Sequence, residues 1–136
     1  QRWGGLFRGR FGGPDAFFSR AFVANYCPLA FVEESGANRT PDKLPSHERE
    51  PLYAACDEAL GEVVAALAPS RIIGVGDFAK KRAEQVARRL GLAVPISQIL
   101  HPSPASPRAN RGWGDEARRT LKDLGLDWPR LAIEST

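Results

Sequence analysis

The sequence contains few of the residues that carry metal, redox or disulfide chemistry. Among 136 residues there is no methionine, and there are only two cysteines and two histidines. Cys27 and Cys56 are too few for a disulfide scaffold, and neither lies in a C-x-x-C pair, so this chain alone cannot supply a four-cysteine zinc or iron–sulfur site. We therefore expect reduced thiols, no metal site and no cofactor.

Long apolar runs are also absent. The longest falls far short of the ~20 residues that span a bilayer, which excludes a transmembrane helix, and no targeting segment is visible. We expect no membrane partner and no secretion, with a nuclear location in a eukaryote or a cytoplasmic one in a bacterium. Because the chain has no methionine, Gln1 cannot be the initiator residue, and we expect the chain to begin downstream of its genetic start.

What the chain does have is enough apolar material for one folded domain. Hydrophobic residues make up 43% of it, and a domain of this size buries roughly two thirds of its unfolded surface. The 19 basic residues exceed the 16 acidic ones by a net charge of +3. This modest excess permits nucleic acid as a partner without requiring it, because phosphate affinity depends on where the cations cluster.

The hydrophobic pattern alternates between strands and helices. We expect two helical pieces within residues 3–20, strands at 22–29, 71–76 and 94–100, helices at 46–67, 77–90 and 113–124, and a surface loop at 33–45. This order predicts an α/β fold with a parallel sheet and helices on its faces. Three strands are few for such a sheet, so we expect its first strands to lie in a part of the domain that precedes this chain.

The loop from His101 to Trp113 carries the most information about function. It leaves the carboxyl end of a predicted strand, which is where open α/β sheets bind ligands, and its prolines stiffen it. Arg108 and Arg111 lie close to the start of the next helix, and a rigid cationic loop with free N–H groups suits a phosphate. On these grounds alone, a connector with a structural histidine remains the alternative.

Two further patterns have plain structural interpretations. Gly74 to Ala79 matches the dinucleotide fingerprint G-x-G-x-x-A, but the next strand lacks the acidic residue that would hold a ribose. We therefore favour tight packing between strand and helix over nicotinamide binding. The helix at 77–90 carries a net charge of +3, which we interpret as a solvated face, with contact to a DNA backbone as the alternative.

Three motifs together resemble a known family. They are His101-Pro-Ser-Pro continuing to Ala109-Asn-Arg-Gly-Trp113, Asn25-Tyr-Cys-Pro-Leu29, and Ser35-Gly-Ala-Asn-Arg-Thr-Pro41. This long and specific spacing is similar to that of the single-strand-selective monofunctional uracil-DNA glycosylases, a branch of the uracil-DNA glycosylase superfamily, over nearly the whole chain. The resemblance implies a three-layer αβα sandwich with a central parallel sheet, of which residues 1–136 form the carboxyl-terminal part of a single domain.

The same resemblance implies a hydrolase of base-excision repair that cleaves the N-glycosidic bond of uracil, and of oxidised uracils such as 5-hydroxymethyluracil, flipped out of DNA. His101 corresponds to the catalytic histidine that hydrogen-bonds uracil O2, and Asn25 to the residue that reads the base edge. Uracil-containing DNA, single- or double-stranded, is the expected partner, and the protein is expected to be monomeric once joined to its amino-terminal part. The expected DNA contacts are Pro102, Ser103, Pro104, Ala105, Ser106, Arg108, Asn110 and Arg111.

These residue types suit that chemistry. Cleavage of the glycosidic bond moves negative charge onto uracil, so a donor aimed at O2 binds the transition state more strongly than the ground state. The carboxamide of Asn25 can donate to O4 and accept from N3–H of uracil, a pattern that cytosine reverses.

The chain departs from the family pattern in two places. Where the family commonly has Arg and then Asn, this chain has Ala105 and Ser106, and an alanine cannot plug the gap that a flipped base leaves. The family's Gly-Met-Asn-Pro-Gly type loop, whose Asn positions the attacking water, is absent, since the only asparagines are Asn25, Asn38 and Asn110. The alternative function is therefore a non-catalytic nucleic-acid-binding α/β fragment.

Overall fold

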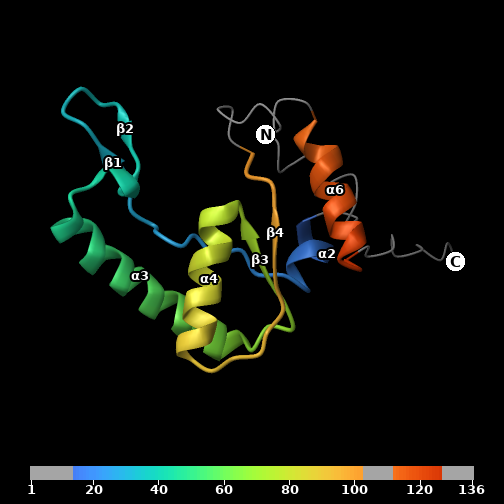
Figure 1. Ribbon diagram of the computed structural model, residues 1–136. Helices are drawn as coiled ribbons and strands as arrows, with labels where there is room; N and C mark the ends of the chain where they lie inside the picture. Colours follow the sequence, from blue (N-terminus) through green and yellow to red (C-terminus); the bar gives the residue numbers. More distant parts are fainter. Residues whose placement is uncertain (1–13, 103–111, 127–136) are drawn as a thin grey trace, which may run out of the picture. The chain divides into compact units, whose positions relative to one another are not determined.

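The computed structural model describes residues 14–102 and 112–126 (Figure 1). The chain divides into two compact units, which we describe separately. Unit 1 comprises Gln1–Val23, Ile73–Asp77 and Gln98–Thr136, and unit 2 comprises Ala24–Ile72 and Phe78–Ser97. In the described ranges, no helix has both the length and the apolar character needed to cross a bilayer.

Unit 2 is built on the long helix α3 (Ser46–Leu67), which has the bounds that the sequence predicts. Pro51 lies inside α3, in its second turn. A proline there removes one hydrogen-bond donor, and the carbonyl that loses its partner belongs to the exposed residue His47. The helix ends at Ala68, which adopts a left-handed conformation (φ 42°) just before Pro69.

The second helix of this unit, α4 (Asp77–Arg89), packs closely against α3. The contact depends on Gly61, because a Cβ at this position would lie 3.4 Å from Leu90 Cδ1 and 3.6 Å from Val86 Cγ1. The buried side chains of these two helices are mostly small or β-branched. The buried apolar residues are Cys56, Val64, Ala83, Val86 and Ala87.

The predicted surface loop at 33–45 contains more regular structure than the sequence indicated. Strands β1 (Phe31–Val32) and β2 (Asn38–Arg39) pair in an antiparallel hairpin, and a 3₁₀ turn, η1 (Pro41–Lys43), follows. The hairpin turn closes through Gly36, whose φ of 80° a residue with a side chain rarely adopts.

The strand predicted at residues 22–29 is wrong. No strand is found there, and the described sheets consist of β1 with β2 and of two later strands. The apolar side chains that suggested a buried strand are largely exposed, with Phe22 at 66%, Val23 at 58% and Leu29 at 60%. Apolar composition alone does not make a strand, because a neighbouring segment must accept and donate the ladder hydrogen bonds.

The other two predicted strands are confirmed as β3 (Ile72–Val75) and β4 (Ile96–Ile99), which pair with each other. Ile72 N donates to Pro95 O over 3.0 Å, and Gly76 N donates to Ile99 O over 2.9 Å. Donor and acceptor advance together along the chain, so the strands run parallel, and α4 connects them (Figure 1). The α/β class is therefore confirmed, with a small parallel sheet.

Unit 1 has an apolar cluster around α6 (Trp113–Asp123). The predicted helix at 113–124 is confirmed, and its residues Trp113, Ala117 and Leu121 are all buried together with Ile99 at the end of β4. The short helix α2 (Pro14–Phe18), the second helical piece expected in residues 3–20, contributes Phe17 to the edge of this cluster. The cluster therefore fixes the end of β4, where the candidate loop begins.

Candidate active site

His101 is exposed and lies two residues after the end of β4, at the carboxyl end of a parallel strand as the sequence predicts. Two hydrogen bonds hold the backbone that leads to it. Gly76 N donates to Ile99 O over 2.9 Å, and the indole Nε1 of Trp113 donates to Leu100 O over 2.5 Å. Trp113 is only 2% exposed, so the anchor for this backbone lies in the apolar cluster of unit 1. An exposed imidazole on such a backbone can offer a hydrogen bond in a defined direction.

Gly76 lies beside His101. A Cβ at this glycine would be 3.2 Å from His101 Cβ, which is tighter than nearly all real contacts of this kind. Gly76 is the second glycine of the G-x-G-x-x-A motif, and its close neighbour is the residue that follows the next strand rather than the helix that the sequence predicted.

Most of the predicted DNA-contact loop lies outside the described residues. At its beginning Pro102 is half-buried, and at its end Gly112 precedes α6 with a φ of 116°. The predicted contact residues that the structure does not describe are Ser103, Pro104, Ala105, Ser106, Arg108, Asn110 and Arg111.

Asn25, the predicted base reader, is exposed in the irregular segment for which the sequence predicted a strand. It belongs to unit 2 whereas His101 belongs to unit 1, so the two predicted site residues are not brought together within one unit. The residue after Asn25 is Tyr26, and its side chain is firmly held.

Three side chains form the Tyr26–Asp57–Arg82 cluster in unit 2. The hydroxyl of Tyr26 donates to Asp57 Oδ1 over 2.8 Å. Arg82 Nε donates to the same hydroxyl over 3.0 Å, and Arg82 Nη2 donates to Asp57 Oδ2 over 2.5 Å. The side chains of Arg82 and Asp57 are only 17% and 7% exposed, so this is a buried ion pair with each charge directly compensated.

Aromatic rings surround this cluster. The ring centroid of Tyr26 lies 5.4 Å from that of Phe78 and 6.1 Å from that of Tyr53, with the planes steeply inclined to each other. The guanidinium carbon of Arg82 lies 5.0 Å from the centroid of Tyr53, within the range of a cation–π interaction. Hydrogen bonds and ring contacts hold the side chain of Tyr26, and this anchors the backbone next to Asn25.

The surroundings also determine the protonation of these groups. Burial and, next, the hydrogen bond to Asp57 raise the pKa of Tyr26 well above its usual value of 10, so its hydroxyl remains a donor. Burial and the neighbouring Cys27 raise the pKa of the Cys56 thiol to about 11. Cys56 is therefore a neutral packing group at physiological pH and does not serve as a nucleophile.

The structure confirms the solvated cationic face of α4 for Lys81, Arg88 and Arg89, which are exposed. Arg82 is the exception, because it is paired with Asp57, and Arg89 Nη2 also donates to Asp57 O over 3.2 Å. Lys80 pairs with Glu84 at 3.6 Å.

The sequence analysis did not identify Asp57. Its signal was available, because a carboxylate beside Cys56 and four residues before Gly61 falls on the buried face of α3 and requires a cation.

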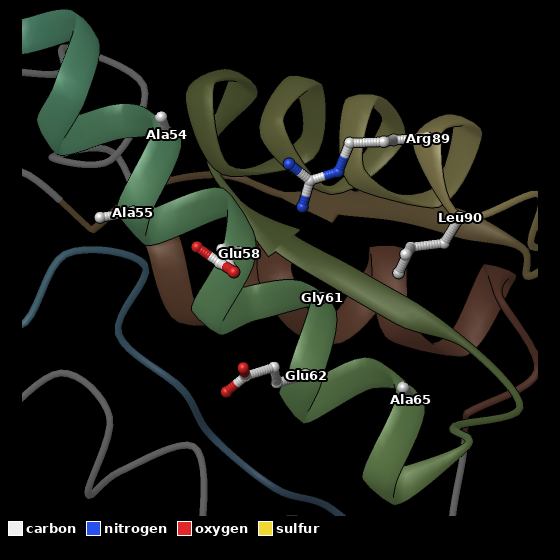
Figure 2. Close-up of a pocket in the computed structure, with 8 residues that line it drawn as sticks. All are labelled: Ala54, Ala55, Glu58, Gly61, Glu62, Ala65, Arg89 and Leu90. Atoms are coloured by element: carbon white, nitrogen blue, oxygen red, sulfur yellow. The ribbon is translucent and has the colours of Figure 1, made fainter.

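A groove in unit 2 does not serve as the active site. It has a volume of about 650 Å³, and Figure 2 shows Arg89 and Leu90 beside the α3 residues that line it. Neither His101 nor Asn25 is among its lining residues, whereas Glu58 and Glu62 are. With two carboxylates against the single cation of Arg89, the lining has a net negative charge, which disfavours a phosphate backbone.

The chain is 45% identical to the single-strand selective monofunctional uracil-DNA glycosylase of Rattus norvegicus, 44% to that of Mus musculus and 43% to that of Bos taurus, in each case over 92% of this chain. The matched region makes up 45–46% of those proteins, so the chain spans about half the length of these relatives. No protein-family model matches the chain. By its similarity to these relatives, and as its motifs indicate, the chain belongs to the family of single-strand-selective monofunctional uracil-DNA glycosylases.

Proposed function

We propose that the protein containing this chain hydrolyses the N-glycosidic bond of uracil flipped out of DNA, a step of base-excision repair. The single observation that carries this proposal is an exposed histidine at the carboxyl end of β4, in a chain 43–45% identical to proteins named as uracil-DNA glycosylases. Because the chain spans about half the length of those relatives, the activity is proposed for the full-length protein.

His101 is the proposed catalytic residue. Negative charge develops on uracil O2 as the glycosidic bond breaks, and an imidazole donor aimed at O2 stabilises that charge. The backbone before His101 is held through hydrogen bonds to Ile99 O and Leu100 O, as described above, so little reorganisation is needed when the charge forms. Such a fixed donor contributes to the rate of the chemical step more than to substrate binding.

Asn25 is the proposed reader of the base. Its carboxamide would donate to O4 and accept from N3–H of uracil, whereas cytosine presents a donor and an acceptor in the opposite order. The support for this role is the exposed position of Asn25 next to the anchored Tyr26. By the same pairing the site would also accept uracils oxidised at C5, such as 5-hydroxymethyluracil, because the substituent lies away from the edge that is read.

The loop after His101 is the proposed DNA contact, with Arg108 and Arg111 on phosphates and Ala105 too small to fill the gap of a flipped base. Single strands demand the least energy for base extrusion, so we propose single-stranded DNA as the better substrate.

We also propose that this chain is the carboxyl-terminal part of one three-layer αβα domain that functions as a monomer. Two observations support this. The parallel sheet has only β3 and β4 among the described residues, and the segment around Phe22 and Val23 exposes apolar side chains that the rest of a domain would cover.

The second candidate is a nucleic-acid-binding protein without catalysis, which the absence of an Asn-Pro motif in this chain favours. A single experiment separates the two. The full-length protein is incubated with a single-stranded oligonucleotide that contains one uracil, and free uracil and abasic sites are measured alongside binding. Release of uracil, with no release of cytosine from a matched oligonucleotide, is expected. Binding of the oligonucleotide without release of any base would establish the non-catalytic alternative.

A further inference from the structure

We propose that Gly76 is a positioning residue for His101, since its missing side chain leaves the space in which the imidazole takes its catalytic position. This inference rests on the proposed function of His101. It gives the G-x-G-x-x-A motif between β3 and α4 a role that does not involve binding a nucleotide.

The backbone at Gly76 is the first observation. Its φ of 91° lies in a region that residues with a Cβ rarely adopt. This conformation turns the chain from the end of β3 into the first residue of α4, Asp77. Any substitution at this position therefore strains the turn.

The space beside Gly76 is the second observation. A Cβ built there would lie 3.2 Å from Cβ, 3.7 Å from Cγ and 3.6 Å from Cδ2 of His101. Only the first of these distances is shorter than an ordinary contact, so the added methyl group would press on the Cβ of His101 and touch the imidazole ring at normal van der Waals distance. To relieve the contact, one of the two residues has to move by a few tenths of an ångström.

His101 is the residue that gives way. Gly76 is tied to β4 by the bond from its N–H to Ile99 O, two residues before His101. On the other side, Leu100 O is held by the buried Trp113. Rotation about χ1 does not move Cβ, so the contact between the two Cβ atoms is relieved by a shift of the backbone. A shift at His101, which follows the last held carbonyl, carries the imidazole with it.

This situation distinguishes Gly76 from the other described glycines with positive φ. At Gly36 (φ 80°), Gly91 (φ 65°) and Gly125 (φ 70°), an added Cβ would have no described atom within 4 Å. At Gly112 the nearest contact, 3.7 Å to an oxygen of Asp115, is an ordinary one. Among these glycines, only Gly76 combines the unusual backbone with a close neighbour, and that neighbour is the proposed catalytic residue.

The first test compares Gly76→Ala with Gly36→Ala in the full-length protein. Both changes strain a backbone of similar φ, but only the first touches His101. A displacement near 1 Å of a catalytic group costs on the order of 100-fold in rate, and the shift here is a few tenths of an ångström. Gly76→Ala should therefore lower the single-turnover rate of uracil release by about 3- to 10-fold, with DNA affinity within about 2-fold. Gly36→Ala should leave both quantities within about 2-fold. Equal rates for the two variants would overturn the proposal.

The second test is a double-mutant cycle with His101→Leu, which separates positioning from general damage. If Gly76 acts through His101, Gly76→Ala should change the residual rate of His101→Leu by less than about 2-fold. The same loss of rate in both backgrounds would show that Gly76 acts independently of His101, contrary to the proposal.

Two further measurements keep the inference testable apart from the proposed function. If the wild-type protein releases no uracil, the proposed function fails, but the imidazole NMR signals still report on Gly76. Gly76→Ala should shift the signals of His101 and leave those of the exposed His47 unchanged, and an unshifted His101 would refute the positioning role.

If Gly76→Ala does not fold, Gly76→Ala combined with His101→Gly removes the clash and should restore part of the lost thermal stability. A double variant no more stable than Gly76→Ala would attribute the defect to the turn alone and contradict the proposal.

Discussion

The two proposed site residues are supported by opposite kinds of interaction. In unit 2, Asn25 precedes a tyrosine that is fixed by a buried ion pair and by aromatic rings. In unit 1, His101 follows a strand end that is fixed by an apolar cluster and by the space at a glycine. A polar support depends on complete pairing of its charges, whereas an apolar support depends on volume. Loss of a charge should therefore be most costly in unit 2, and a change of side-chain volume most costly in unit 1.

The largest loss of stability should follow from breaking the ion pair in unit 2. Asp57→Ala leaves Arg82 buried without its carboxylate, and removal of one partner of a buried pair costs about 3–5 kcal/mol. Urea unfolding measures this change. Glu84→Ala is the matched control, since it breaks the more exposed ion pair with Lys80 on α4, the helix that also carries Arg82. It should cost no more than about 1 kcal/mol of stability. Similar costs for the two variants would show that the Tyr26–Asp57–Arg82 cluster does not hold unit 2 together.

A smaller loss of stability, accompanied by a loss of rate, should follow from Trp113→Phe in unit 1. The phenyl ring keeps most of the apolar contact but cannot donate to Leu100 O, and an unsatisfied carbonyl costs about 1–3 kcal/mol. Uracil release should slow as well, because Leu100 precedes His101.

The control for this variant is Ile99→Val, which trims the same cluster and leaves the indole hydrogen bond intact. It should lower stability by about 0.5–1.5 kcal/mol without slowing uracil release. If both variants slow the reaction equally, packing rather than the hydrogen bond controls the position of His101.

The sequence predicted those elements whose signal is local. The face of α6 was found because Trp113, Ala117 and Leu121 recur at the helical period, and α3 was found from its apolar spacing and from Pro69. The segment at 22–29 was mistaken for a strand because its apolar residues satisfy a local rule. Strand formation depends on a distant hydrogen-bonding partner, and composition does not reveal one.

The site shows the same division. His101 and Asn25 were identified from their motifs, although their roles stay predictions. Arg82 was misjudged because its partner Asp57 lies 25 residues earlier, on another helix. Gly76 was recognised as a packing glycine, but its neighbour His101 lies on the next strand's end and could be found only from the structure.

The proposed chemistry depends on His101, and the chain contains its own control, since His47 is its only other histidine and its side chain is 79% exposed. The decisive measurement is the rate of uracil release from a single-stranded oligonucleotide by the full-length protein carrying His101→Leu or His47→Leu. Removal of a donor to the developing oxyanion should slow His101→Leu by about 100- to 1,000-fold, while His47→Leu keeps the wild-type rate. A wild-type rate in His101→Leu would contradict the assignment of His101 as the catalytic residue.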